Sequence, residues 1–157
     1  MNEREVALAV DLFREYFNEK GWCENEPYPG VNEMLEELHA SGKKLYLATA
    51  KLEKFAERIL RHFGFDKYII GFVGADYNGH KAEKDTLIAS LLEKEQIIPA
   101  EKVVMVGDTI FDIEGGKANG LSTVAVFYGF GEPETLCATN PDFQADSVEE
   151  LFEVLNF

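Results

Sequence analysis

The chain has 157 residues, of which 46% are hydrophobic and 28% charged, as is typical of one folded domain. Its formal net charge of -14 argues against binding to nucleic acid or to anionic membranes, because proteins that bind either normally present a basic surface. No apolar run approaches the roughly 20 residues of a membrane-spanning helix. The first residues lack the pattern of a signal peptide. The cysteines Cys23 and Cys137 are expected to be reduced, which indicates the cytoplasm.

The first predicted element is a helix over residues 3–19. Asn2 can cap its N-terminus, Glu5 completes a capping box, and Gly21 follows its end. Apolar residues cover a broad face of this helix, so we expect that face to pack heavily against other structure. The segment over residues 23–30 contains two prolines and a glycine, which is typical of a linker.

Strands and helices then alternate to the end of the chain. The predicted helices span residues 31–40, 52–63, 83–95, 112–118 and 147–155, and the predicted strands span residues 44–48, 69–73, 102–106 and 123–127. The strands are continuously apolar, which is typical of a parallel sheet covered on both faces. The sequence therefore predicts an α/β fold. Gly115 and Gly116 inside one helix each cost about 1 kcal/mol relative to alanine, which indicates a close approach of backbones there.

Ligands of an open parallel sheet bind beyond the carboxyl ends of its strands, so residues that follow the predicted strands are candidates for chemistry. Thr49 follows the strand over residues 44–48, and Lys84 lies at the start of the helix over residues 83–95. Neither is specific by itself. A threonine in this position more often caps the next helix than binds a ligand, and most lysines are solvated at the surface.

The most specific element is Gly107-Asp108-Thr109-Ile110-Phe111-Asp112, which follows the strand over residues 102–106. Asp108 leaves the strand and Asp112 lies on the following turn, so both carboxylates can point at one small volume. Two ionised carboxylates held that close require a cation, and oxygen ligands with room for waters suit Mg²⁺. The alternative is that Asp112 caps the next helix and Asp108 belongs to a turn.

Taken in order, these three elements resemble the second, third and fourth motifs of the haloacid dehalogenase superfamily, in its phosphoglycolate phosphatase-like branch. The stretches that carry the resemblance are residues 28–31, 45–51, 55–60, 104–108, 117–120 and 128–131. The resemblance covers essentially the whole chain. It implies a Rossmann-like parallel sheet with flanking helices, and a Mg²⁺-dependent phosphatase that hydrolyses small phosphorylated metabolites.

The resemblance also implies which residues hold the phosphate. Thr49 and the backbone N–H of Ala50 correspond to the group that hydrogen-bonds the transferring phosphoryl oxygens. Lys84 corresponds to the lysine that offsets the charge between nucleophile and phosphate, because Ile88 matches the apolar position four residues further on in that family pattern. Lys81 is the alternative.

The metal site follows from the same resemblance. Asp108 resembles the direct ligand of Mg²⁺, and Asp112 resembles the second acidic residue, which reaches the metal through water. Mg²⁺ and one lysine would make the pocket attractive to a phosphate while the rest of the protein stays acidic.

One motif of the family is missing from the sequence. In the family, Asp-x-Asp-x-Thr after a first strand supplies the nucleophilic aspartate, which forms an aspartyl-phosphate, and the general acid/base. No two aspartates of this sequence lie closer than four residues apart. Asp11 follows two apolar residues but lies inside a predicted helix. We therefore expect no nucleophile in this chain, and little or no activity of this chain alone.

The missing motif also affects the expected architecture. Residues 1–22 resemble the last helix of a helical cap, and residues 23–157 a core domain that lacks its first strand. In the family that strand lies between the strands predicted over residues 44–48 and 102–106, so two edges with unpaired backbone groups face a gap. We expect the chain to close the gap, to exchange elements in a homodimer, or to pair with a complementing N-terminal segment.

Two other functions fit parts of the pattern. One is a non-catalytic remnant that binds Mg²⁺ and a phosphorylated ligand, or a partner protein. The other is a response-regulator receiver domain, in which an acidic pair would precede Asp, Thr and Lys, whereas the order here is Thr, Lys, Asp, Asp. The substrate is not determined, because the cap usually selects it in this superfamily. Phosphoglycolate, nucleoside monophosphates and other small phosphates fit equally well.

Overall fold

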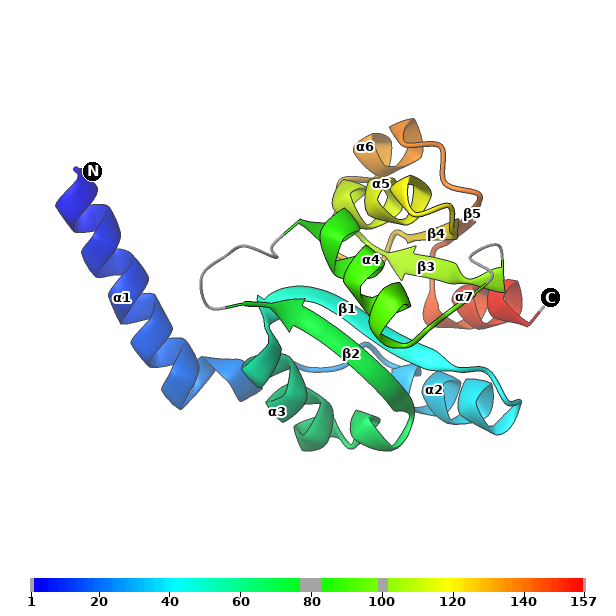
Figure 1. Ribbon diagram of the computed structural model, residues 1–157, viewed down its shortest axis with the longest axis horizontal. Helices are drawn as coiled ribbons and strands as arrows, with labels where there is room; N and C mark the ends of the chain where they lie inside the picture. The colour runs from blue at the N-terminus through cyan, green and yellow to red at the C-terminus, as the bar shows by residue number, and fades with distance from the viewer. Residues whose placement is uncertain (1, 77–82, 99–101, 157) are drawn as a thin grey trace.

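The structure is a computed structural model that describes residues 2–76, 83–98 and 102–156 (Figure 1). Its helices are α1 (Glu3–Glu19), α2 (Val31–Ala40), α3 (Glu53–Phe63), α4 (Lys84–Lys94), α5 (Ile110–Ala118), α6 (Pro133–Ala138) and α7 (Val148–Leu155), with short 3-10 helices η1 (Gly21–Cys23) and η2 (Phe65–Lys67). Its strands are β1 (Leu45–Leu52), β2 (Ile69–Ala75), β3 (Val104–Gly107), β4 (Ser122–Val126) and β5 (Phe143–Ala145). The predicted α/β fold is confirmed.

The strands of the described residues form two parallel sheets. β1 pairs with β2 in one sheet, and β3, β4 and β5 pair in that order in the other. Within the described ranges, β1 and β3 each keep one edge without a strand partner. Every side chain of β1 and β3 is at least partly exposed, whereas most of β2 and β4 is buried. These are the two edges between which we expect a gap. That a further strand fills it stays a prediction.

Most predicted boundaries are confirmed to within two residues. β1 is the exception, because it continues beyond its predicted end at Ala48 to Leu52, and Thr49 therefore lies inside the strand. No element was predicted over α6 and β5. β5 is three residues long and only its Ala145 is buried, so the sequence carries no periodic apolar pattern for it.

The helix α1 extends away from both sheets (Figure 1). Its predicted capping box is present, since Asn2 Oδ1 accepts a bond from the amide of Glu5 and the Glu5 carboxylate accepts one from the amide of Asn2. The prediction that its apolar face packs heavily is wrong. Phe17 packs edge-on against Phe55 of α3, but Phe13 is 63% exposed, because the described residues bring no other element to that face. No helix of the described residues is long and apolar enough to span a bilayer.

Helices α4 and α5 pack on one another and thereby join the two sheets, because α4 contacts β1 and β2 while α5 contacts β3 and β4. A β-carbon on Gly115 would lie 3.0 Å from the backbone nitrogen of Asp85, at the start of α4. Asn119 Nδ2 donates a bond of 3.0 Å to the carbonyl of the same Asp85. A β-carbon on Gly116 would lie 2.9 Å from Met105 Cβ of β3. The predicted close approach of backbones is confirmed at Gly115, whereas Gly116 lies against side-chain atoms of Met105 and Thr123.

The centre of the second sheet contains a buried polar side chain. Thr123 of β4 is fully buried, and both its amide and its hydroxyl donate bonds of 2.8 Å to Asp142 Oδ2. These two donors, the hydroxyl first, hold the pKa of the Asp142 carboxyl below its ordinary value of 3.8. Asp142 therefore connects β4 to the segment that leads into β5.

We predict that Asp142→Ala lowers the free energy of unfolding by about 1–3 kcal/mol, because it leaves two buried donors of Thr123 without an acceptor. Urea unfolding at pH 7 measures the change, and Asp146→Ala, which removes an exposed carboxylate nearby, is the control. Since the folded-state pKa of Asp142 is lowered, its contribution is fully present above pH 3.8 and is lost as the pH falls through the folded-state pKa. A wild-type advantage that persisted unchanged well below that range would contradict this assignment.

Candidate functional site

Lys84 begins α4 and connects the two sheets. Its Nζ donates a bond of 3.0 Å to the carbonyl oxygen of Ala48 in β1, and it lies 2.8 Å from Asp112 Oδ1 in the first turn of α5. The side chains of Lys84 and Asp112 are only 15% and 7% exposed. A pair so shielded from water interacts more strongly than an exposed one. The structure therefore places a positive charge beside Thr49, the residue after Ala48.

Asp112 uses both of its carboxylate oxygens. Oδ1 faces Lys84, and Oδ2 accepts bonds from the amide and the hydroxyl of Thr109, at 3.0 and 2.7 Å. Thr109 is the N-cap of α5, so this arrangement is a capping box. A β-carbon on Gly107 would collide with the Asp112 side chain. Asp112 is therefore the partner of the lysine and also a member of the capping box, whereas the cap itself, which the alternative interpretation assigns to Asp112, is Thr109.

Asp108 follows the last residue of β3 directly, as predicted, and contacts the loop after β4. Its Oδ2 accepts a bond of 2.8 Å from the amide of Phe130. β-Carbons on Gly129 and Gly131 would both collide with Asp108, so only glycine allows this loop to approach so closely. The loop thereby orients the Asp108 carboxylate.

A tyrosine pair lies beside this loop. The rings of Tyr28 and Tyr128 pack edge to face with their centroids 5.2 Å apart. Burial, and to a smaller extent the charges of Tyr28 and Asp108, raise the pKa of the Tyr128 hydroxyl to about 12. Tyr128 therefore stays neutral at physiological pH and does not serve as a base there.

The other predicted residues lie as follows. Thr49 does not cap α3, whose N-cap is Leu52 without a side-chain bond. The Thr49 hydroxyl instead accepts a bond of 3.2 Å from the amide of Lys51. Lys81 lies outside the described residues. The structure thus brings Lys84 to Asp112 and to the strand that carries Thr49, but no described contact joins Asp108 to either of them.

The two aspartates differ in their capacity to bind a metal. Within the described residues, Asp108 Oδ1 makes no hydrogen bond, whereas both oxygens of Asp112 are occupied. No group of three or more His, Cys, Asp or Glu side chains suited to a metal occurs in those residues. Mg²⁺ commonly takes one or two protein carboxylates and keeps several waters. Asp108 as a direct ligand, with Asp112 acting through water, is a donor set that fits this ion.

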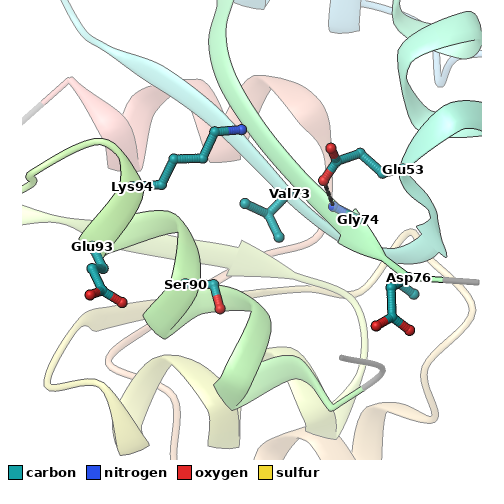
Figure 2. Close-up of a pocket in the computed structure, with 8 residues that line it drawn as sticks. Glu53, Val73, Gly74, Asp76, Ser90, Glu93 and Lys94 are labelled. Atoms are coloured by element: carbon teal, nitrogen blue, oxygen red, sulfur yellow. Dashed lines mark hydrogen bonds between the residues drawn. The ribbon is translucent and has the colours of Figure 1, made fainter. Parts of the chain in front are cut away.

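A hollow of about 600 Å³ lies elsewhere, at the outer edge of β2 (Figure 2). Among the described residues its charged lining is mostly acidic, with Glu53, Asp76 and Glu93 beside one lysine, Lys94. Two of these side chains complete the strand edge, because Glu53 accepts a bond from the amide of Gly74 and Lys94 donates one to a carbonyl of β2. An excess of carboxylates repels a phosphate, so we do not assign the phosphate site here.

Sequence reasoning missed two groups that position the site. Thr109 holds Asp112, and the amide of Phe130 holds Asp108. The available signals were a threonine three residues before Asp112, which is the spacing of a capping box, and a Gly-x-Gly pattern after a strand. Backbone partners such as the Ala48 carbonyl leave no signal in a sequence.

The chain is similar to proteins of known families. Residues 2–126 match the model of the haloacid dehalogenase-like hydrolases. A 5'-nucleotidase of Pseudomonas aeruginosa is 37% identical over 94% of this chain and 66% of its own length. A phosphoglycolate phosphatase of Vibrio parahaemolyticus is 37% identical over 95% of this chain and 65% of its own length. The crystal structure of a predicted phosphatase from Clostridium acetobutylicum is 32% identical, with a TM-score of 0.92 over 100% of this chain and 73% of that one.

We predict that Lys84→Met lowers the free energy of unfolding by about 3 kcal/mol, because it leaves the buried Asp112 carboxylate without its countercharge. Adding Asp112→Asn removes that charge, so the double variant should lose less than the sum of the two single variants. Denaturant unfolding of the four proteins measures the coupling. Lys94→Met removes an exposed lysine from the same helix and is the control. A cost for Lys84→Met no larger than the control's would show that the pair is not buried in solution.

Proposed function

The chain belongs to the haloacid dehalogenase-like hydrolase family, and we propose that it is the core of a Mg²⁺-dependent phosphatase of small phosphorylated metabolites. The observation that supports this most is the position of Lys84, held between the Ala48 carbonyl and Asp112 and largely withdrawn from solvent. A fixed cation at the carboxyl end of a parallel sheet stabilises the charge of a bound phosphate. It does so within a chain whose net charge of -14 would otherwise repel one.

The proposed phosphate site consists of Thr49, Ala50 and Lys84. The Thr49 hydroxyl and the Ala50 amide donate bonds to the phosphoryl oxygens, and Lys84 neutralises part of their charge. Lys84 needs no large movement for this role, because it already contacts the residue before Thr49. Asp112 keeps the ammonium group in place.

The proposed metal ligand is Asp108, with Asp112 reaching the ion through water. When bound, Mg²⁺ would supply a charge that polarises the phosphoryl group. The chain's own contribution is orientation: Phe130 holds one oxygen of Asp108 and leaves the other free of hydrogen bonds to described residues. Thr109 keeps Asp112 on the first turn of α5.

We propose that the nucleophilic aspartate is supplied from outside these 157 residues, since no Asp-x-Asp occurs in them. The unpaired edges of β1 and β3 would accept the strand that carries it, as a complementing segment or from a second copy of the chain. In this proposal residues 1–22 belong to a cap and residues 23–157 to the core domain. The chain spans about two-thirds of the length of the curated relatives named above, which leaves room for such a segment in the whole protein.

The substrate and the compartment also belong to the proposal. The relatives are named for phosphoglycolate and for 5'-nucleotides, both small phosphomonoesters, so we assign this class. Both cysteines are free thiols, in keeping with a reducing cytoplasm.

A non-catalytic protein that binds Mg²⁺ and a phosphorylated ligand is the second candidate function. The missing nucleophile favours it. An in-frame Asp-x-Asp-x-Thr upstream of Met1 would decide for the enzyme, and a fusion carrying that segment should then turn over substrate.

We predict that this chain alone binds Mg²⁺ but hydrolyses p-nitrophenyl phosphate little or not at all. Isothermal titration with MgCl₂ should show binding that Asp108→Ala abolishes. Asp11→Ala, which removes an exposed aspartate of α1, should leave it unchanged. Binding that survives Asp108→Ala would contradict the metal site. Strong turnover that Asp108→Ala removes would support the site and disprove the missing nucleophile.

A further inference from the structure

Phe130 is an exposed aromatic residue in direct contact with the proposed metal ligand. Its side chain is 94% exposed, while its amide donates the 2.8 Å bond to Asp108 Oδ2. A single exposed apolar residue is ordinary on a protein surface. The position of Phe130 is not, because it lies beyond the carboxyl end of β4, at the edge where parallel sheets bind ligands.

The backbone on both sides of Phe130 is held tightly. Gly129 lies against the Asp108 side chain and Gly131 against the Asp108 backbone, so closely that β-carbons would collide at both positions. A β-carbon on Gly131 would also lie 2.8 Å from Leu136 Cδ1 of α6, and Leu136 is fully buried. A well-packed loop thus presents a phenyl ring to solvent, and the packing gives the ring no partner within the described residues.

A second exposed ring lies three residues after Asp108 in the sequence. Phe111 occupies the first turn of α5, beside Asp112, and is 65% exposed. Its neighbours Asp112 and Ile113 are both buried. The proposed metal ligands therefore stand next to exposed aromatic residues, one on β4's loop and one on α5.

From this arrangement we infer that Phe130 stacks on the alcohol part of the substrate, and that the site takes phosphomonoesters bearing a planar aromatic ring, the class of the nucleoside monophosphates. The inference rests on the proposed phosphate site. In this inference the phosphate binds at Thr49, Ala50 and Lys84, and its ester group points toward the loop in which the Phe130 amide holds Asp108. A base gains stacking energy from such a ring. The carboxylate of a phosphoglycolate-like ester gains none, since the face of a phenyl ring is electron-rich.

The experiment compares adenosine 5'-monophosphate with ribose 5-phosphate, which carries the same phosphate and sugar but no base. Isothermal titration of this chain in MgCl₂ should give a dissociation constant about tenfold lower for the nucleotide. Phe130→Ala should remove this preference, because it deletes the ring but keeps the backbone amide that bonds Asp108. Phe130→Trp should keep or increase the preference, whereas Phe130→Leu, apolar but without a π-face, should lose it.

Phe143→Ala, which truncates an exposed phenylalanine of β5, is the control and should change neither affinity. Because Phe130 is almost fully exposed, its truncation opens no cavity, and circular dichroism confirms that each variant is folded. Equal affinities for the two ligands, or a nucleotide affinity unaffected by Phe130→Ala, would overturn the inference and leave the proposed function standing. Failure of both ligands to bind, or ribose 5-phosphate binding that ignores Asp108→Ala, would overturn the proposed phosphate site and this inference with it.

Discussion

The contact on which the rest of the structure depends is the ion pair of Lys84 and Asp112. It joins α4, which covers the sheet of β1 and β2, to α5, which covers the sheet of β3 to β5. Lys84 also bonds the Ala48 carbonyl, so one ammonium group connects both halves of the fold. Since β1 and β3 do not pair with each other in the described residues, helix contacts and this pair hold the halves together. The same charge belongs to the phosphate site that we propose.

Glycines allow the backbone to come close enough for this arrangement. Gly115 permits α4 and α5 to touch, Gly107 makes room for the Asp112 side chain, and Gly129 and Gly131 bring the loop after β4 onto Asp108. At each of these positions the neighbouring atoms lie directly against the glycine, with no side chain between them. This close packing leaves the carboxylates of Asp108 and Asp112 little freedom to move. The geometry of the candidate site is therefore a property of the packing around it, in addition to its own polar residues.

Much of the fold could be predicted from local pattern. The helices α1 and α2 have the predicted bounds, and the capping box at Asn2 and Glu5 is present. The misses have physical causes. β1 extends through Thr49 because pairing with β2 continues past its apolar run, and β5 is too short to show a period. The pattern of α1 predicts an apolar face, and for that reason we expect other structure to cover it. Whether another element packs there depends on the rest of the structure, which the pattern of α1 does not contain.

By itself the sequence determined the fold class, the order of the motifs and the identity of the polar residues at the strand ends, because periodicity and motif spacing are local properties of a chain. It also determined that no Asp-x-Asp is present. Only the tertiary structure decided that Lys84 faces Asp112, that a backbone amide orients Asp108, and that Phe130 lies exposed beside it. These contacts join residues 28 and 22 positions apart, and their distances depend on how helices and sheets pack, which no local pattern encodes.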